Sequence, residues 1–451
     1  MDKKNLRYYY WLTTEFFKKN AKLIILASTL SFVLVIGLIS IAPYVGDIVL
    51  TKKDIIGMVG QYDYNNYPEE ISNKISNGLV YINEKGVSLP ALSTKWEVKN
   101  NSKEFTFYLK DNLVWNDGKP FKASEIDYRF TDVETMALND KTILFKLKDP
   151  FPTFITYLTK PVVRYPLMGV AGLYRVNNLK SRYGYLKEVR LSPNKKGLPI
   201  VIYKFYDNEN LLVNAYKIGE INQMYVQKKS VADTFSSWKN TSIVKTVDHT
   251  KLLTLFFNFN NPVLKDKDNR NAFEKAFNFD DFKDDGERAQ GSIPPNSWAY
   301  NPTIKTTVYD KDTAEELFKK IFPSSQSATL NLVSSYDYSD LIDKLVKQFN
   351  NVGLKIGVNY LTQNLPNDFD IFLGYLKIPQ DPDQYYFWHS TQKSNVGSYV
   401  NLKIDKLLED GRSNYFVEER KKVYLEFQRI LNDDPPGIFL LYPYVYTIKR
   451  K

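Results

Sequence analysis

The stretch that most limits how this chain folds is an uncharged apolar run near its N-terminus, residues 23–42, LIILASTLSFVLVIGLISIA. A run of this length, as a helix, crosses the hydrocarbon core of a bilayer. Basic residues dominate the segment before it: Lys3, Lys4, Arg7, Lys18, Lys19 and Lys22 stand against Asp2 and Glu15. Because positively charged flanks stay on the cytoplasmic side, the sequence predicts a single-pass protein of the cell membrane. Residues 1–22 form its cytoplasmic segment, and the large C-terminal part is extracytoplasmic.

A cleaved signal peptide is the alternative interpretation of the same run. Ser40-Ile41-Ala42 satisfies the small-x-small preference of a cleavage site. The run is longer than the usual signal core, and Pro43 is a poor residue directly after a cleavage site. We therefore favour a retained transmembrane anchor at residues 23–42.

Aromatic residues crowd the segment before the anchor: Tyr8, Tyr9, Tyr10, Trp11, Phe16 and Phe17. Tyrosine and tryptophan favour the level of the lipid headgroups. This composition predicts an interfacial, partly amphipathic segment, and Tyr44 would serve as the outer anchor.

Composition narrows the class of the exported part. About 400 residues follow the anchor, which is more than one ordinary domain, so two or three lobes are expected. The chain has no cysteine, which excludes disulfides, thiol catalysis and zinc–thiolate sites. Its net charge of +10 is not gathered in a basic tract, which argues against nucleic acid as a partner. The acidic residues between 280 and 287 lack EF-hand spacing, so neither a metal nor a cofactor is predicted.

Local patterns predict individual strands and helices. In residues 104–110, EFTFYLK, the apolar side chains of Phe105, Phe107 and Leu109 alternate with polar ones, as in a half-buried strand. Polar turns flank this segment on both sides. Residues 339–350 repeat apolar side chains at helical spacing, and Asp310 or Asp312 is expected to cap a helix that begins near them.

An ordered series of motifs between residues 78 and 130 points to one family. The motifs are a GLV strand, P-x-L with W-E-V, F-x-L, W-x-D-G-x-P and S-E-x-x-x-x-F, carried by Gly78, Pro90, Leu92, Trp96, Glu97, Val98, Phe107, Leu109, Trp115, Asp117, Gly118, Pro120, Ser124, Glu125 and Phe130. This order resembles the bacterial extracellular solute-binding proteins of family 5, which include the oligopeptide- and dipeptide-binding subunits of ABC importers. Weaker matches extend the resemblance over nearly all of residues 54–451.

The resemblance implies an α/β fold of the periplasmic-binding-protein-like class II type, two-lobed with a small extra lobe, here preceded by one transmembrane helix. It places lobe I in residues 54–85, 160–248 and 430–451, the small lobe II in 86–159, and lobe III in 249–429. The implied function is that of the extracytoplasmic substrate-binding component of an ABC importer, a monomer that captures peptides in an inter-lobe cleft and delivers them to permease subunits in the membrane.

The same resemblance directs attention to residues 368–390, DFDIFLGYLKIPQDPDQYYFWHS. In peptide-binding relatives, an Asp of the corresponding D-P-D region pairs with the α-ammonium of the ligand, and this role is carried to Asp381 first and Asp383 second. Helix capping is the alternative for an Asp at such a position. Aromatic walls for varied side chains are expected from Tyr375, Trp298 and Trp388, with core packing as their alternative, and Asn258 is carried over from an L-x-F-N match.

Other functions stay open at this stage. Motifs of the HExxH, P-loop and G-x-S-x-G types are missing from the sequence, so we do not expect an enzyme. A membrane-tethered sensor or adhesion module built on the same fold is the main alternative. Receptors for nickel, haem or oligosaccharide are others, because a fold alone does not fix its ligand.

Overall fold

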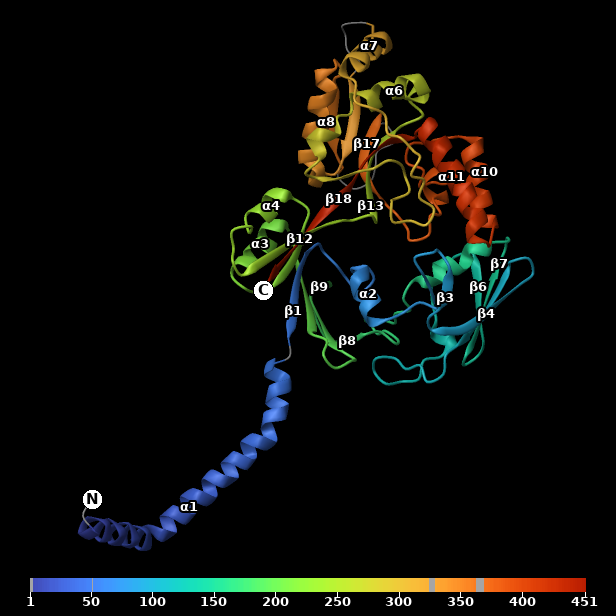
Figure 1. The fold of residues 1–451 in the computed structure, drawn as a ribbon. Helices are drawn as coiled ribbons and strands as arrows, with labels where there is room; N and C mark the ends of the chain where they lie inside the picture. Colours follow the sequence, from blue (N-terminus) through green and yellow to red (C-terminus); the bar gives the residue numbers. More distant parts are fainter. Residues whose placement is uncertain (1–2, 51, 324–328, 362–368) are drawn as a thin grey trace.

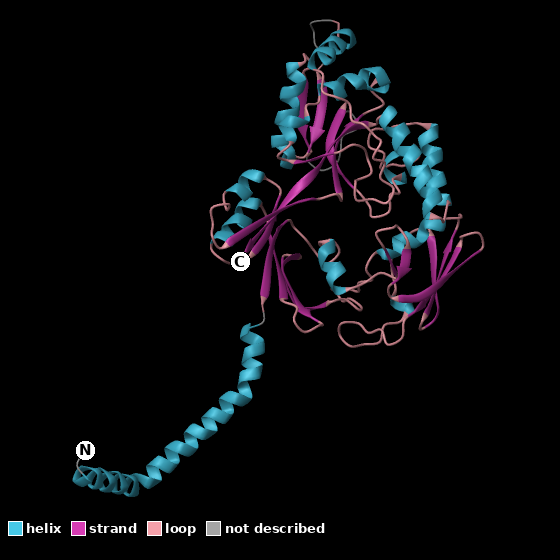
Figure 2. Ribbon diagram, in the orientation of Figure 1, coloured by secondary structure: helices cyan, strands magenta, loops and turns pink. Residues whose placement is uncertain are grey.

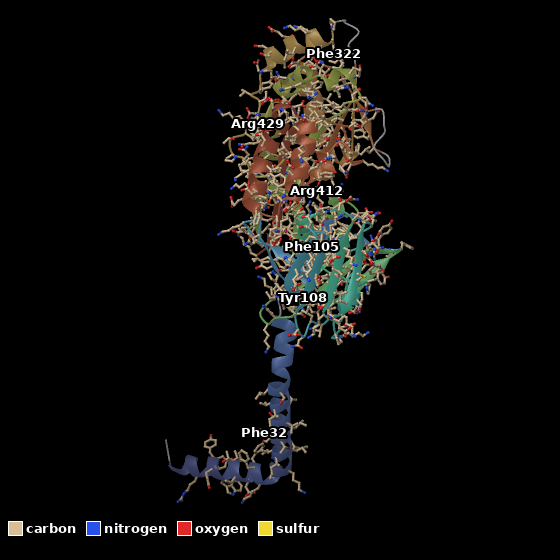
Figure 3. The ribbon with its side chains drawn as sticks, turned by 90° about the vertical axis from the view of Figure 1, so that its right-hand side faces the viewer. Phe32, Phe105, Tyr108, Phe322, Arg412 and Arg429 are labelled. Carbon is tan, nitrogen blue, oxygen red and sulfur yellow. The ribbon has the colours of Figure 1, made fainter. Side chains whose placement is uncertain are left out.

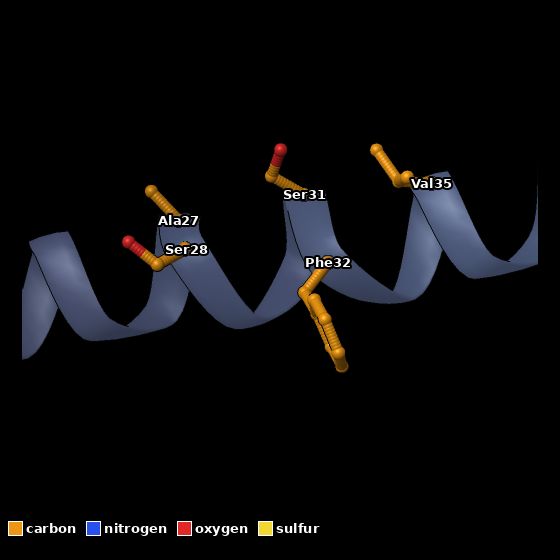
Figure 4. A pocket seen from close by; sticks show the side chains of 5 residues that line it. All are labelled: Ala27, Ser28, Ser31, Phe32 and Val35. Carbon is orange, nitrogen blue, oxygen red and sulfur yellow. The ribbon is translucent and has the colours of Figure 1, made fainter.

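The computed structural model describes residues 3–50, 52–323, 329–361 and 369–451. Its first element is the long helix α1 (Lys3–Leu50), which stands away from the folded body in Figure 1. Within α1, the segment Arg7–Gly37 is long and apolar enough to cross a membrane, and none of it is buried. Figure 4 shows Ala27, Ser31 and Val35 on one side of this segment and Phe32 on the other. The helix therefore covers the predicted span and continues beyond both of its ends.

Twelve strands of the described chain form one continuous sheet, in the order β16-β15-β17-β13-β18-β11-β1-β10-β9-β8, with β12 and β14 paired to β18 off this path. Helices cover it, so the fold is α/β, and the body divides into two halves (Figure 2). Below, lobes I, II and III name the residue ranges given in the sequence analysis, and that division stays our proposal.

Lobe I contains the part of the sheet nearest the anchor. Its central strand β1 pairs in parallel with β10 and β11, as expected where helical crossovers join neighbouring strands. The lobe I strands are β1 (Lys53–Val59), β8 (Tyr174–Arg182), β9 (Tyr185–Pro193), β10 (Ile200–Tyr206), β11 (Gln223–Val226) and β12 (Thr241–Val247), and its helices are α2 (Glu69–Ile75), α3 (Glu209–Lys217) and α4 (Lys229–Asp233).

Lobe III contains the other part of the sheet, and its core lies on both faces of strand β13. Its strands are β13 (Lys251–Phe257), β14 (Gly286–Arg288), β15 (Leu330–Ser334), β16 (Ile356–Tyr360) and β17 (Ile371–Lys377). Its helices are α5 (Pro262–Lys265), α6 (Lys267–Ala276), α7 (Lys311–Ile321), α8 (Ser339–Asn351), α9 (Tyr385–Trp388), α10 (Leu402–Ser413) and α11 (Val417–Asp433), with short 3₁₀ turns at η3 (Phe279–Phe282) and η4 (Tyr336–Tyr338). The last residues of α11 lie past the proposed lobe boundary at 429.

The chain passes between these two parts twice, side by side. One passage is the link from β12 to β13, residues 248–250, and the other is the last strand, β18 (Gly437–Arg450). The N-terminal part of β18 pairs with β13 and β14, whereas its part from Tyr444 onward pairs with β12 and β11. At the change of partner, the Asp248 amide donates to the Pro443 carbonyl over 2.9 Å. Two adjacent backbone passages are the arrangement of a hinge.

Lobe II carries a separate antiparallel sheet of order β4-β5-β7-β6. Its strands are β4 (Ser93–Lys99), β5 (Glu104–Leu109), β6 (Val133–Asn139) and β7 (Thr142–Leu147), and the short turns η1 (Ala123–Glu125) and η2 (Pro152–Thr159) lie beside them. The hairpin β2 (Val80–Ile82) and β3 (Ser88–Pro90) precedes this sheet. Phe105, Phe107 and Leu109 of β5 are buried in the lobe II core, while Tyr108, on the other face, is partly exposed (Figure 3).

Several local predictions are confirmed. The alternation in residues 104–110 forms β5, and the helical pattern of residues 339–350 forms α8, with Ile342, Leu345 and Phe349 buried. The carboxylate of Asp310 caps α7 by accepting from the Thr313 amide over 3.0 Å. Each of these depended on neighbours close in the sequence, where periodicity and capping are informative.

Candidate functional site

Strand β17 leads into a loop at the meeting point of lobes II and III that is buried from Asp381 to Gln384. The loop, residues 378–384, ends at helix α9 and contains Asp381 and Asp383, which are 7% and 8% exposed. A buried carboxylate needs compensating charge or hydrogen bonds, because its desolvation is otherwise costly. The partners of these two side chains therefore decide what the loop does.

Asp381 forms an ion pair inside lobe III. Both of its oxygens accept from Arg420 of α11: Oδ1 from Nη2 over 2.6 Å and Oδ2 from Nη1 over 2.9 Å. Arg420 also donates to the Gly411 carbonyl and to the Tyr424 hydroxyl. Bidentate pairing of this kind is the strongest geometry that Arg and a carboxylate adopt. The charge of Asp381 is thus compensated by the protein itself.

Asp383 lies two residues further on and connects two lobes. Its Oδ2 accepts from Nε of Arg412, on α10, over 2.8 Å, and from the hydroxyl of Tyr157, in η2 of lobe II, over 3.1 Å. Its Oδ1 accepts from the Tyr385 amide over 3.0 Å, at the start of α9. The last contact is a local i to i+2 turn just before α9, whose N-cap is Gln384 and has no side-chain cap. Asp383 therefore joins lobe II to lobe III.

Aromatic rings surround Arg412, the partner of Asp383. The guanidinium of Arg412 lies 3.8 Å from the ring centroid of Tyr385, 5.0 Å from that of Tyr386 and 5.2 Å from that of Phe151 in lobe II. Such contacts add cation–π attraction where the cation is partly desolvated. Figure 3 shows Arg412 at the level where the helices of lobe III meet the sheet of lobe II.

Burial and the neighbouring carboxylates shift the pKa of Arg420 and of Arg412 in opposite directions. Burial by itself would lower the pKa of Arg420 and of Arg412, but the attraction and hydrogen bonds of Asp381 and Asp383 outweigh it, so the pKa of both arginines is raised. Burial, and then the charge of Asp383, raise the pKa of Tyr157. Both arginines are thus held charged, and Tyr157 is held neutral as a hydrogen-bond donor.

Two other predicted site residues lie close to this loop. Trp388 is 1% exposed, packs against Phe256, and donates from Nε1 to Oε1 of Gln384 over 2.8 Å. Core packing, the alternative given above, describes it in this conformation. Trp298 lies over the Arg420 guanidinium at 5.3 Å and is also close to Gly86 in the turn between β2 and β3.

The other two predicted site residues, Tyr375 and Asn258, lie apart from the loop. The ring of Tyr375, in β17, contacts that of Tyr338 with centroids 5.2 Å apart, and it packs against the lobe III core cluster on the other side of the strand from Trp388. Asn258 is 6% exposed and donates to the Phe369 carbonyl over 2.6 Å. The structure thus groups Asp381, Asp383, Trp298 and Trp388 but not the other two, and a ligand contact stays a prediction for all six.

Further contacts join the lobes near this loop. Gln380 donates from Nε2 to the Ile82 carbonyl over 3.3 Å, and the ammonium of Lys377 pairs with the carboxylate of Glu69 in α2. In addition, no group of three or more acidic or histidine side chains that could hold a metal ion occurs among the described residues.

Sequence reasoning did not assign the partners of the two Asp residues. One signal was present for Arg420: it lies four residues before Tyr424, so both side chains fall on one helix face, and a buried arginine requires a carboxylate. Arg412 and Tyr157 had no such signal, because 255 positions separate them.

The fold defines a class, that of proteins with two α/β halves joined by adjacent strand passages. The comparisons identify the family: the chain belongs to the bacterial extracellular solute-binding proteins, family 5, whose model matches residues 89–398. Its members are solute-binding proteins rather than enzymes, and they act outside the cytoplasm. The recognition made from the sequence motifs is therefore confirmed.

Individual relatives are distant. The probable D,D-dipeptide-binding periplasmic protein DdpA of Escherichia coli is 22% identical, over 77% of this chain and 78% of the relative. NikZ from Campylobacter jejuni, solved in complex with Ni(L-His), superposes with a TM-score of 0.72 at 22% identity, over 88% of this chain and 94% of that one. AppA from Bacillus subtilis, in complex with a nonapeptide, superposes with a TM-score of 0.70 at 19% identity, over 89% of this chain and 95% of that one. These likenesses confirm the predicted fold class.

Proposed function

We propose that this protein is the substrate-binding component of an ABC importer, held at the membrane by α1, which captures peptides between lobes I and III and delivers them to a permease. The similarity to relatives named for peptide binding carries the peptide part of the proposal. The likeness to a nickel-complex receptor makes nickel complexes the alternative ligand.

The backbone geometry supports a mechanism by hinge closure. Lobes I and III are joined by two adjacent strand passages, and a rotation of one lobe against the other about that line would open and close the space between them. A ligand that contacts both lobes binds the closed form better than the open one and shifts the population toward it. The closed form would then be the one that docks on the permease.

The experiment that tests the ligand class is a thermal-shift screen of the full-length protein in nanodiscs. Free peptides of several lengths are compared with nickel–histidine complexes, haem and oligosaccharides. A ligand present at 100 times its Kd stabilises the folded state by about 2.7 kcal/mol. Stabilisation by peptides alone supports the proposal, whereas stabilisation only by nickel complexes replaces peptide with the alternative. A response to none of these ligands would favour the sensor or adhesion function.

Asp381 is retained as the proposed partner of the peptide ammonium, but its test must respect its pairing with Arg420. A lone Asp381→Ala change leaves a buried arginine unpaired, so loss of binding would follow from misfolding as well. The double variant Asp381→Ala/Arg420→Met removes both charges. It is compared with wild type on a free peptide and on the same peptide with an acetylated N-terminus. If Asp381 binds the ammonium, only wild type prefers the free peptide; an equal preference in both proteins contradicts the role, and Asp383 is then tested in the same way.

The proposed anchor has a direct test in the mature N-terminus. A retained α1 predicts that the protein isolated from membranes keeps residues 1–42. A mature chain that begins directly after Ala42 would show that the segment is a signal peptide.

A further inference from the structure

The part of α1 before the predicted span has two chemically different sides. At 100° per residue, Arg7, Trp11, Thr14, Lys18 and Lys22 form one stripe along the described helix. The opposite arc, about 160° wide by the same geometry, carries five large apolar side chains, Tyr9, Tyr10, Leu12, Phe16 and Phe17, with the polar Thr13 and Asn20 between them. Tyr8 and Lys19 lie at the boundary between the two sides.

The apolar side is open in the structure. Tyr9 is 61% exposed, Tyr10 73%, Phe16 59% and Phe17 57%. Large exposed aromatic groups in one arc mark an interaction surface. Because α1 stands away from the folded body (Figure 1), that surface is not covered by the rest of the chain.

The helix also bends between its first turns and the part that carries Phe32. Figures 1 and 3 show the first turns of α1 lying across the direction of the part that carries Phe32. With the span upright in a bilayer, this bend lays the first turns along the membrane surface.

From these three observations we infer that residues 7–22 form a surface-bound helix that binds the anionic headgroups of the cytoplasmic leaflet. The inference rests on the proposed anchor, since the span is what brings the segment to the bilayer. Arg7, Lys18 and Lys22 contact the headgroups, and the aromatic arc enters the interface. The charge decides the lipid class, because the segment carries four basic residues against the single acid Glu15, and basic segments next to a span bind anionic leaflets.

Because this sequence contains no cysteine, single nitroxide labels can be placed at introduced cysteines. The labelled variants are Phe16→Cys on the aromatic arc, Lys18→Cys on the basic stripe and Phe32→Cys inside the span. Each is reconstituted in nanodiscs of phosphatidylcholine, with and without phosphatidylglycerol. Electron paramagnetic resonance then measures relaxation by oxygen and by a water-soluble nickel chelate, which together report depth.

We expect the label at position 16 to lie roughly 5–10 Å inside the interface when phosphatidylglycerol is present. Position 18 stays accessible to the chelate, and position 32 is protected in both lipids. Adding Arg7→Gln/Lys22→Gln should return position 16 toward the chelate, whereas the matched change Lys195→Gln/Lys196→Gln, at exposed sites of the folded body, should leave it protected.

Each contrary result has a distinct meaning. If position 32 is protected but position 16 is as accessible as position 18, the anchor stands and the surface helix is wrong. Protection at position 16 that ignores both lipid charge and the Arg7/Lys22 change overturns the role of the basic stripe. An unprotected position 32 overturns the anchor, and the inference fails with it.

Discussion

Two acidic side chains two residues apart, Asp381 and Asp383, have different partners in this protein. Asp381 pairs with Arg420 within lobe III, where the two side chains are 8% and 3% exposed. Asp383 pairs with Arg412, which is 16% exposed, and also accepts from Tyr157 of lobe II. Both ion pairs thus lie within lobe III, but only the Asp383–Arg412 pair also makes a contact to lobe II, through Tyr157.

This difference separates stability from conformational coupling. A pair within one lobe is kept whether the lobes are open or closed, so its loss weakens folding in every state. A contact between lobes is made in some arrangements and not in others, and it therefore biases the equilibrium between them. The D-P-D motif combines both functions because its two carboxylates meet arginines from different helices, Arg420 of α11 and Arg412 of α10, and only Asp383 also accepts from Tyr157 of lobe II.

The largest expected effect comes from breaking the pair within lobe III. Asp381→Ala leaves the Arg420 guanidinium buried without its carboxylate, and we expect unfolding in urea to show a loss of roughly 3–5 kcal/mol. The double variant Asp381→Ala/Arg420→Met should recover much of that loss, since it leaves no unpaired charge. A single variant as stable as wild type would mean that the pair does not hold the lobe.

The sequence predicts contacts between residues that are close along the chain, but not contacts between residues that are far apart. The strand β5, the helix α8 and the Asp310 cap depend on residues a few positions apart, and periodicity was enough to predict them. The Asp383 contact with Tyr157 joins residues 226 positions apart, and no local pattern encodes such a meeting. Family resemblance supplied the fold and directed attention to the loop, but it assigned the Asp residues to a ligand, and it did not reveal that arginines of the same chain occupy them.

A smaller effect is expected from breaking the contact between lobes. Asp383→Ala should cost about 2 kcal/mol, less than Asp381→Ala, because Arg412 keeps its aromatic neighbours and some access to water. The Asp383→Ala variant should also show a local effect. Amide hydrogen exchange should become faster in η2 and α10, where lobes II and III meet. The matched control is Tyr424→Phe, which removes a hydrogen bond at the lobe III pair and should leave exchange in η2 unchanged. Equal exchange in both variants would remove the distinction between the pairs.

The smallest expected effect concerns the contact between lobes II and III, and it is measured at alkaline pH through the titration of Tyr157. Burial and Asp383 raise the pKa of this tyrosine above its ordinary value of 10.0. Below pH 10 the side chain is protonated in both the folded and the unfolded state, so it adds no pH dependence. Above pH 10 the unfolded chain loses this proton while the folded chain keeps it, and stability falls as the pH rises.

The expected slope from this one group is about −1.4 kcal/mol per pH unit in the window above pH 10. Tyr157→Phe removes the titrating hydroxyl, so urea unfolding of this variant between pH 9 and 11, roughly one unit on each side of the ordinary pKa, should show a shallower decline than wild type. The variant also loses a hydrogen bond to a charged group, which costs about 1.5–3 kcal/mol at neutral pH, and its curve should therefore approach that of wild type as the pH rises. Parallel curves would mean that Tyr157 ionises freely in the folded protein, as it would if lobe II were already detached from Asp383.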